Sequence, residues 1–332
     1  MANGLARVGV VAIGRNEGER LRKCFDSIPA EIGAVVYVDS GSTDGSVELA
    51  RSRGYEVVAL DMSTPFTAAR ARNAGFRRLS ELAGGLDYVQ FVDGDCALAA
   101  GWLTQAQSAL DDRPDVGAVW GRRRELHPDR SLYNRVCDVE WSQEAPGDTE
   151  VFGGDVLVRC RAVRELGGYN PSIIAGEDPE FAHRLHKRGY RILRLDAEMT
   201  LHDAAITRFR QWWTRTKRSG YAYAQVSALH RGEPERFWEK DTRRALIWGM
   251  LVPALVPVLA LPTLGMSSLL LGAYPVRAVR IARDAKRRGV PAAYAKYWAL
   301  HCVGASFPQA AGIASYHWQR LRGKVPRLIE YK

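Results

Sequence analysis

The stretch YVQFVDGDCAL, residues 88–98, places two carboxylates one residue apart where an apolar run ends. Asp93 and Asp95 flank Gly94, and a glycine there lets the backbone turn sharply enough for both side chains to converge. Two like charges that close repel each other and resist burial, so either water solvates them in a turn or a cation lies between them. Carboxylate oxygens suit Mg²⁺ or Mn²⁺, which usually take their other ligands from phosphates and water. The pattern predicts a metal–phosphate site, with a solvated surface turn as the alternative.

A further acid, Asp39, follows the apolar run 34–38 in the segment VVYVDSGSTDGS. Asp39, Ser40 and Ser42 are natural turn residues, and a strand, a turn and a helix start would explain them without a ligand. A carboxylate at a strand end could also accept hydrogen bonds from a nucleotide base or from ribose hydroxyls. The G-x-G-x-x-G pattern of dinucleotide-binding sites is missing after the first apolar run, where the chain reads AIGRNEGE. A nucleotide is therefore expected to be bound by other contacts.

The segment IIAGEDPEF supplies a third acid, Asp178, directly before Pro179. This order predicts Asp178 as the N-cap of a helix and Pro179 as its first residue. A carboxylate at a helix start is held rigidly and can still direct one oxygen at a substrate. Rigid placement is what a general base needs, so Asp178 is a candidate base.

The segment LHDAAITRFRQWWTRTKRSGYAYAQ, residues 201–225, contributes the last candidates. His202 is interpreted as a metal ligand, a phosphate contact or a core histidine. Arg215 and Arg218 lie on a predicted basic helix beside two tryptophans. Their guanidinium groups suit a diphosphate or lipid headgroups, with a solvated basic face as the alternative.

The elements that must position these residues follow from an alternation of apolar and amphipathic runs. We expect strands at 8–13, 34–38, 55–60, 88–92 and 116–121, with helices at 17–28, 44–54, 66–83 and 100–112. Such an alternation predicts a Rossmann-like, mostly parallel sheet covered by helices on both faces. Ligands of such sheets bind at the carboxyl ends of the strands, where these polar residues fall. The pattern is irregular from 125 to 160 and resumes as a helix and strand over 177–195, then a basic helix over 207–231.

The charge of the 332-residue chain is unevenly spread around a net value of +10. Residues 1–200 hold 25 Lys and Arg against 30 Asp and Glu, whereas residues 201–332 hold 22 against 7. The basic character of the C-terminal part indicates an anionic partner such as membrane phospholipid. Nucleic acid is disfavoured, because the basic residues bracket apolar runs and form no RNA- or DNA-binding motif. The five cysteines lack metal-ligand spacing, so neither a disulfide framework nor a zinc site is expected.

An apolar run over residues 245–274 carries no charge at all. Three prolines interrupt it, and basic residues flank it on both sides, which argues against one straight crossing. We expect a re-entrant or interfacial hairpin broken near Pro262–Gly265, with two spans or a buried hairpin as alternatives. Residues 290–318 contain Lys296 and His301 and are interpreted as amphipathic.

Four ordered segments resemble the family 2 glycosyltransferases, inverting enzymes with the A-type glycosyltransferase fold. They read VVAIGRNEG, YVDSGSTDGS, FVDGD and GGDVLVRCRAVRELGGYNPSIIAGEDPEFAHRLHKRGYRI with the following LHD, over residues 8–220. The resemblance implies a nucleotide-sugar donor and a divalent metal, Mn²⁺ or Mg²⁺. We expect a UDP-sugar ahead of GDP- or TDP-sugars.

The resemblance also implies roles for individual residues. Asp39 would contact the nucleoside, Asp93 would lie near ribose and metal, and Asp95 and His202 would be the metal ligands. Asp178 would be the catalytic base and Glu177 would orient the base or the acceptor. The expected nucleotide-binding set is completed by Ala12, Arg15, Asn16, Glu17, Ser40, Ser42, Arg72 and Gly94. Contacts to the acceptor or the diphosphate are expected from Gly154, Asp155, Arg215 and Arg218.

Two departures from the family pattern refine this expectation. The common DDGS is DSGS here, so Ser40 replaces a second acid near the nucleoside. The Q-x-x-R-W signature of processive synthases is absent, because QWWTR has Thr214 where arginine would be. Transfer of one sugar per encounter is therefore expected.

These observations give an expected organisation and setting. A catalytic domain over residues 1–230, with a donor half to 121 and an acceptor half from 122, would precede a helical membrane-associating region over 231–332. The acceptor would be a lipid-linked sugar or glycolipid at the cytoplasmic face of the plasma membrane, in cell-surface polysaccharide or glycolipid synthesis. A nucleotidyltransferase or a non-catalytic nucleotide-binding protein are the alternatives, and the oligomeric state is left open.

Overall fold

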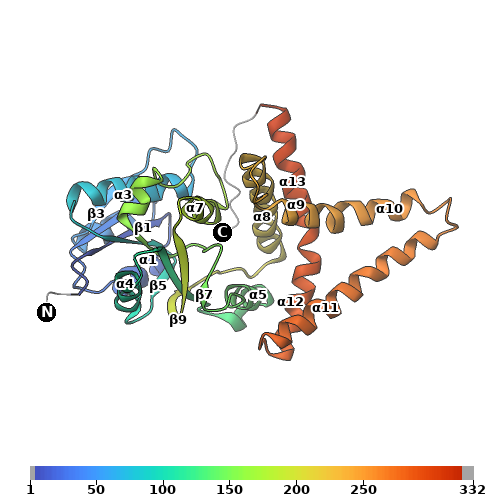
Figure 1. The fold of residues 1–332 in the computed structure, drawn as a ribbon, viewed down its shortest axis with the longest axis horizontal. Coiled ribbons are helices and arrows are strands. Elements are labelled where there is room, and N and C mark those ends of the chain that lie inside the picture. Colours follow the sequence, from blue (N-terminus) through green and yellow to red (C-terminus); the bar gives the residue numbers. More distant parts are fainter. Residues whose placement is uncertain (1–3, 324–332) are drawn as a thin grey trace. The chain divides into compact units, whose positions relative to one another are not determined.

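The computed structural model describes residues 4–323, which form two compact units (Figure 1). Unit 1 contains the chain up to Leu126 together with Glu144–Ala204, and unit 2 contains His127–Gln143 and the chain from Ala205 onward. The predicted catalytic domain of residues 1–230 thus includes all of unit 1 and the first part of unit 2. Residue 230 is not a point of division, because the helix that ends just before it belongs wholly to unit 2.

Unit 1 is built on one sheet with the strand order β3-β2-β1-β4-β8-β6-β9-β5, and β7 pairs with β9 outside this path. The predicted strands are present as β1, β2, β3, β4 and β6, and the strand predicted after the helix in 177–195 is present as the start of β9. Strands β5, β7 and β8 were not predicted. The bounds of the strands are β1 Val8–Gly14, β2 Ala34–Asp39, β3 Glu56–Ala59, β4 Tyr88–Asp93, β5 Cys96–Leu98, β6 Val116–Glu125, β7 Gly147–Asp148, β8 Val156–Arg159 and β9 Arg191–His202.

The sheet is mixed rather than mostly parallel. Strands β1 to β4 pair in parallel, as the alternation predicted. Strand β8 then lies antiparallel between β4 and β6, although the stretch that contains it was expected to be irregular. Among the described residues, four strand pairs are parallel and four are antiparallel. The mostly parallel prediction therefore holds only for the first half of the sheet.

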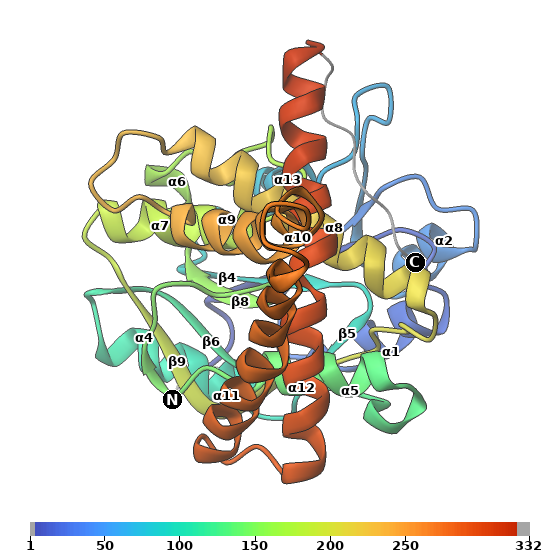
Figure 2. The ribbon, with the colours of Figure 1, turned by 90° about the vertical axis from the view of Figure 1, so that its right-hand side faces the viewer.

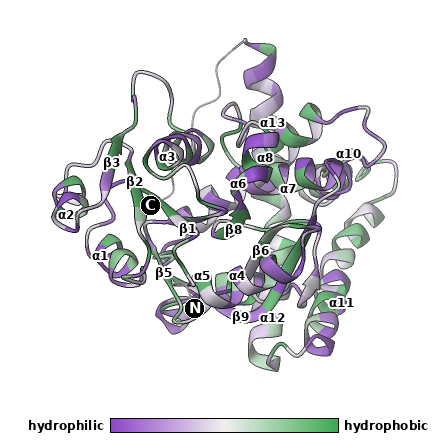
Figure 3. Ribbon diagram, turned by 60° about the vertical axis from the view of Figure 1, so that its left-hand side comes forward, coloured by the Kyte–Doolittle hydropathy of each residue, from purple (hydrophilic) through white to green (hydrophobic). Residues whose placement is uncertain are grey.

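Helices cover this sheet, and its strands form the apolar centre of unit 1 (Figure 3). The helices of unit 1 are α1 Glu19–Asp26, α2 Ser46–Ser52, α3 Ala68–Leu82, α4 Trp102–Asp112, α6 Cys160–Glu165 and α7 Glu177–Lys187. Helix α3 starts at the N-cap Thr67, whose side chain accepts a hydrogen bond from the Arg70 amide. It packs very close to the sheet, because a Cβ atom on Gly75 would lie 2.3 Å from Cγ1 of Val11.

Unit 2 is helical (Figure 2). Its α-helices are α5 Leu132–Trp141, α8 Phe209–Leu229, α9 Glu239–Leu246, α10 Val252–Val258, α11 Ala273–Arg287, α12 Ala292–Gly304 and α13 Ser306–Leu321. Helices α8 and α13 pack backbone against backbone. A Cβ atom on Gly220 would lie 2.0 Å from the Gln309 carbonyl oxygen, and one on Gly312 would lie 2.1 Å from that of Lys217. Only glycine permits such an approach at these two positions.

The apolar run 245–274 forms a hairpin with its turn where the sequence placed the break. One limb passes through a π-helical turn, Ile247–Leu251, into α10 and ends at Val258. The second limb starts with a 3₁₀-helix, Met266–Gly272, and continues into α11. Within residues 4–323, no helix combines the length and the apolar character that a membrane crossing requires.

Candidate active site

The predicted acids gather at one edge of unit 1 because parallel strands end there together. Gly14 of β1 pairs with Asp39 of β2, and Ile13 pairs with Asp93 of β4. Gly94 follows closely against β1, since its amide donates to the Ile13 carbonyl at 2.7 Å. The edge is the carboxyl end of these strands, where ligands of such sheets bind.

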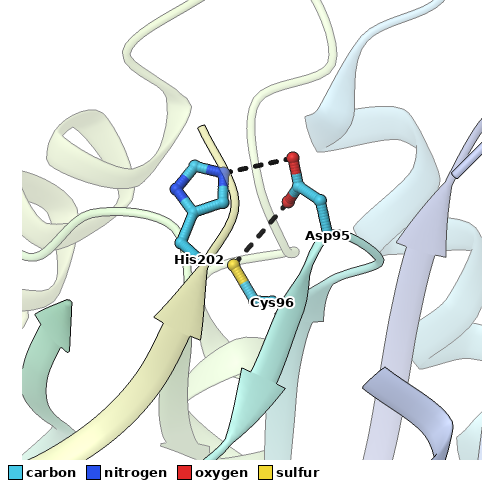
Figure 4. Close-up of side chains that lie close together, drawn as sticks. All are labelled: Asp95, Cys96 and His202. Carbon is cyan, nitrogen blue, oxygen red and sulfur yellow. Dashed lines mark hydrogen bonds and ion pairs between the residues drawn. The ribbon is translucent and has the colours of Figure 1, made fainter. Parts of the chain in front are cut away.

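Asp95 lies beside His202 because β5 and β9 pair in antiparallel register, with Cys96 opposite His202 (Figure 4). His202 Nε2 is 3.1 Å from Asp95 Oδ2, and the two side chains are only 9% and 10% exposed. The Cys96 thiol is 3.7 Å from Asp95 Oδ1. Ligand atoms of all three lie within 4.8 Å of one another.

The donor atoms of this cluster fit a divalent cation. The Cys96 sulfur is a soft ligand, whereas Mn²⁺ and Mg²⁺ prefer oxygen and imidazole ligands. A carboxylate and an imidazole remain, and this pair suits Mn²⁺ and is compatible with Mg²⁺. Asp95 and His202 are therefore placed together as the sequence predicted.

Arg72 of α3 joins two groups of acids from distant parts of the chain. Its guanidinium lies 2.9 Å from Asp93 Oδ1, 2.9 Å from Glu177 Oε1 and 3.1 Å from Asp178 Oδ1. The Arg72 side chain is 2% exposed and lies over the ring of Tyr169 at 5.4 Å. The donors of Arg72 are directed at three carboxylates, of which Glu177 and Asp178 are buried and Asp93 is 29% exposed. The nucleotide contact predicted for Arg72 stays a prediction.

Asp155 is a second buried connector. It has no exposed surface, and its oxygens accept hydrogen bonds from the Asp93 amide at 3.0 Å and the Thr200 hydroxyl at 2.7 Å. The Arg123 guanidinium lies 2.8 Å from Asp155 and 3.7 Å from Asp93. These contacts give Asp155 a positioning role, and contact with an acceptor stays a prediction.

Arg123 was missed by the sequence reasoning. It lies in the run RRR directly after the apolar residues of β6, at the kind of position that identified the other site residues. Its neighbour Gly154 has φ +73°, and a Cβ atom there would lie 1.7 Å from Arg123 Nη2. Glycine at 154 is therefore required for Arg123 to reach Asp155. The Gly154 amide also donates to Asp178 Oδ2 at 2.8 Å.

Burial dominates the ionisation of the two central carboxyl groups. It raises the pKa of Asp178 to about 7, with Glu177 and Asp93 adding to the rise, while Arg72 and the Gly154 amide act against it. Burial also raises the pKa of Asp93, again against the attraction of Arg72. A carboxylate with a pKa near neutrality is suited to accept a proton at physiological pH.

Asp178 does not cap its helix as predicted. Helix α7 starts at Glu177 after Gly176, whose φ of +84° supplies the entry turn. Asp178 is thus the second helical residue and Pro179 the third. Asp178 still lies in the first turn of the helix, held by the Gly154 amide and Arg72.

The predicted nucleotide-binding residues form two loops that are tied together. The Asn16 amide donates to the Ser42 hydroxyl at 2.9 Å, and Asn16 Oδ1 accepts from the Thr43 amide at 2.8 Å. Asp39 Oδ2 accepts from the amides of Gly41 and Ser42 at 2.9 and 3.0 Å. The Asp39 carboxylate thus shapes its own turn, in addition to the nucleoside contact predicted for it.

The remaining predicted residues differ in accessibility. Arg15 is exposed, and Glu17 is partly exposed and pairs with Arg20 at 2.8 Å. Ala12 lies within β1 and Ser40 directly follows β2, and both have 0% exposure; their contact with a nucleotide stays a prediction. Arg215 and Arg218 lie on α8 in unit 2, where Arg215 pairs with Glu140 of α5 at 2.9 Å. Their predicted contact with a diphosphate stays a prediction.

Comparisons with known proteins give one matching family model and several distant relatives. The family model described as Glycosyl transferase family 2 matches residues 10–165. Glycosyltransferase AglE of Haloferax volcanii is 25% identical over 204 residues, which are 58% of this chain and 65% of that protein. The succinoglycan biosynthesis protein ExoA of Rhizobium meliloti is 28% identical over 201 residues, 54% of this chain and 55% of that protein. The match therefore spans less than two thirds of each relative.

A solved structure shares the fold. It is the mannosyltransferase PcManGT of Pyrobaculum calidifontis, in complex with GDP-mannose and Mn²⁺. The TM-score is 0.60 at 19% identity, and the likeness covers 95% of this chain and 88% of that one. The resemblance in fold thus includes both units of the chain.

Replacing Arg72 by methionine is expected to destabilise unit 1 by about 3–5 kcal/mol at pH 8, because three acids would lose their buried counter-charge. The loss should shrink at pH 5, where Asp178 would be protonated given its pKa of about 7. Thermal unfolding at both pH values measures this. The control is Arg78→Met in the same helix, whose side chain is 38% exposed and whose ion pairs should contribute less than about 1 kcal/mol. Equal losses in the two variants would contradict the assigned role of Arg72.

Proposed function

This chain belongs to glycosyltransferase family 2 through residues 10–165, and we propose that it transfers a sugar from a nucleoside-diphosphate sugar to an acceptor hydroxyl with inversion at the anomeric carbon. The observation that carries the proposal is that Arg72 forms ion pairs with both Asp93, which lies beside the proposed metal site, and Asp178, the proposed base. One buried network thus sets a cation site and a candidate base at a fixed separation, as a displacement reaction requires.

The donor side of the proposal rests on the strand edge. Asp95 and His202 would hold a divalent metal, Mn²⁺ or Mg²⁺, which when bound stabilises negative charge on a departing diphosphate. The Asp39 turn and the Asn16 loop would receive the nucleoside. PcManGT, which shares the fold, carries GDP-mannose and Mn²⁺.

Asp178 is proposed as the base. An acceptor hydroxyl is a weak nucleophile until it loses its proton, and Asp178 would take that proton as the oxygen attacks the anomeric carbon. The bond from that carbon to the diphosphate breaks on the opposite side, which inverts the configuration. Arg72 and the Gly154 amide hold the two Asp178 oxygens at 3.1 and 2.8 Å, so the carboxylate is fixed before the acceptor arrives.

The proposed acceptor is a lipid-linked sugar or glycolipid at the cytoplasmic face of the plasma membrane, and transfer is non-processive. The excess of 22 Lys and Arg over 7 Asp and Glu in residues 201–332 supports a membrane-facing role. One relative is named for the biosynthesis of succinoglycan. The pathway proposed is accordingly the assembly of cell-surface polysaccharide or glycolipid.

Calorimetric titration of purified protein with UDP, GDP, TDP and CMP, each with and without Mn²⁺, tests the donor side. We expect one diphosphate to bind only with Mn²⁺, and Asp95→Asn to weaken that binding by at least about tenfold through loss of a ligand. Asp61→Asn, an exposed acid at the same strand edge, is the matched control. Metal-independent binding, or an unchanged response in Asp95→Asn, would remove the metal from the site.

Replacing Asp178 by asparagine should leave Mn²⁺–nucleotide binding intact and lower the transfer rate by about 10²–10⁴-fold, because the base is lost while the shape stays. Release of nucleoside diphosphate from a candidate donor measures the rate. Wild-type turnover in this variant would refute the base assignment. Release of pyrophosphate by the native protein would instead indicate a nucleotidyltransferase.

The rate should rise with pH through the Asp178 pKa of about 7, because only the ionised carboxylate accepts a proton. Glu177→Gln removes a charge that raises this pKa, so the acidic limb of the profile of log kcat/KM should move to lower pH. The conservative Glu177→Asp retains the charge and should move the limb less. If the apparent pKa on the acidic side of the profile is the same in Glu177→Gln as in the native protein, a group other than Asp178 controls it.

A further inference from the structure

The turn of the hairpin in unit 2 exposes many large apolar side chains. We call residues 258–271 the tip, and no charged residue occurs between Arg244 and Arg277. Leu261 and Leu264 are 89% and 94% exposed, and further exposed side chains are Val258, Met266, Leu269, Leu270 and Leu271. A contiguous apolar patch of this kind marks a surface that binds a partner or a membrane.

The polar side chains of the tip are hydrogen-bonded inward. The Thr263 hydroxyl donates to the Leu259 carbonyl at 2.5 Å, and the Ser267 hydroxyl to the Val256 carbonyl at 2.8 Å. The Ser268 hydroxyl donates to the Gly265 carbonyl at 2.8 Å. Each hydroxyl therefore has a partner within the hairpin, although Ser268 itself is exposed, and most of the other exposed side chains are leucine, valine and methionine.

Most amides of the turn are also bonded within the hairpin. The turn amides bond to carbonyls within the hairpin, at distances of 2.7–3.3 Å for Leu259, Ala260, Thr263, Leu264, Gly265 and Met266. The Ser267 amide donates to the Thr263 hydroxyl at 3.1 Å. Pro262 brings no amide hydrogen at all. Non-helical backbone enters hydrocarbon only when its polar groups are satisfied internally, and these bonds satisfy seven of the turn's amides.

The base of the hairpin carries the residues that favour a membrane interface. The Tyr274 hydroxyl donates to the Trp248 carbonyl at 2.6 Å, which ties the two limbs. The Arg277 guanidinium lies 5.0 Å from the centre of the Trp248 ring and donates to the Ser306 hydroxyl at 2.9 Å. Tryptophan, tyrosine and arginine are the side chains that collect at headgroup level.

The first limb of the hairpin is long enough to enter one leaflet of a bilayer but too short to cross both. From Gly249 above the base to Val258, the first limb has helical residues for about 15 Å at about 1.5 Å per residue. The hydrocarbon core of a bilayer is about 30 Å thick, so this limb reaches its middle and no further. A crossing would need about 20 apolar residues in each limb.

The basic residues that follow the second limb favour anionic lipids. Helix α11 and the residue after it carry exposed basic side chains, Arg280, Arg283, Lys286, Arg287 and Arg288. Asp284 is the only acid in this stretch and pairs with Arg288. Such a cluster next to an apolar segment attracts anionic headgroups.

We propose that the tip inserts into a single leaflet of a membrane containing anionic lipids, with Trp248, Tyr274 and Arg277 at headgroup level. This deepens the proposed function and rests on its membrane-proximal acceptor. The occupant of the apolar surface is lipid, and neither a second copy of the chain nor a crossing of the bilayer is required.

The first test is sedimentation of the full chain with vesicles of phosphatidylcholine, with and without phosphatidylglycerol. We expect binding only with phosphatidylglycerol and an affinity about 100-fold lower in Leu264→Asp. Leu321→Asp changes a leucine that is 83% exposed elsewhere in unit 2 and should bind like the native chain. The double variant Arg280→Gln and Arg283→Gln should bind about 30-fold more weakly.

The second test measures depth. A fluorophore on Leu264→Cys, in a Cys302→Ser background because the other four cysteines are buried, is quenched by nitroxides at known acyl positions. Single-leaflet insertion predicts the strongest quenching by nitroxides near the acyl ends. Quenching by a water-soluble agent trapped inside the vesicles would show a crossing and overturn the proposal.

Three other results would also overturn it. They are equal binding to neutral vesicles, full binding by Leu264→Asp, and a soluble dimer that Leu264→Asp dissociates without any vesicle binding. Binding of nucleotide and Mn²⁺ is measured on the same samples and should be unchanged in every tip variant. If the native chain binds nucleotide with Mn²⁺ but no vesicles, the insertion alone is refuted. If it binds anionic vesicles but no nucleotide with Mn²⁺, the donor site alone is refuted.

Discussion

A guanidinium group with almost no access to water holds the site of unit 1 together. Burying a charge costs several kcal/mol unless good partners surround it, and Arg72 has partners from the end of β4 and the start of α7. Arg72 can reach both because Gly75 lets α3 lie against β1 without an intervening side chain. The spacing between the two groups of acids is thus set by how closely one helix packs on the sheet.

The same arrangement leaves Asp178 in a balanced state. Burial and neighbouring acids favour its neutral form, and Arg72 and the Gly154 amide favour the charged form. Opposing influences of this size keep a carboxyl group close to half-ionised near neutral pH. Asp155 is a second buried acid that is paired with an arginine. The Arg123 guanidinium and two hydrogen bonds, from the Asp93 amide and the Thr200 hydroxyl, hold its carboxylate.

The sequence predicted the parts of this protein whose signals are local. Strands β1 to β4 and helices α1 to α4 follow from hydrophobic periodicity, and acids directly after strands located Asp93 and Asp95. Strands β5 and β8 have only three and four residues, too few to show a period, and they exist because neighbouring strands pair with them. The mixed character of the sheet was missed for that reason. Arg72 was identified as a site residue, but its contact with Glu177 was not predicted, because the two residues lie about a hundred positions apart.

The edge of the sheet has a consequence of its own. Strand β5 is the last in the strand order, and its three residues offer a very short unpaired edge to other chains, which discourages edge-to-edge aggregation. So short a strand has little to fix its alignment with β9, and a slip of one residue would turn the β5 side chains to the opposite face of the sheet and displace Asp95 from His202. An ion bound by both Asp95 and His202 would link the start of β5 to the end of β9. Removal of the metal would then loosen the pairing of β5 with β9 at the edge of the sheet. The cation would thus stabilise the fold in addition to taking part in the reaction.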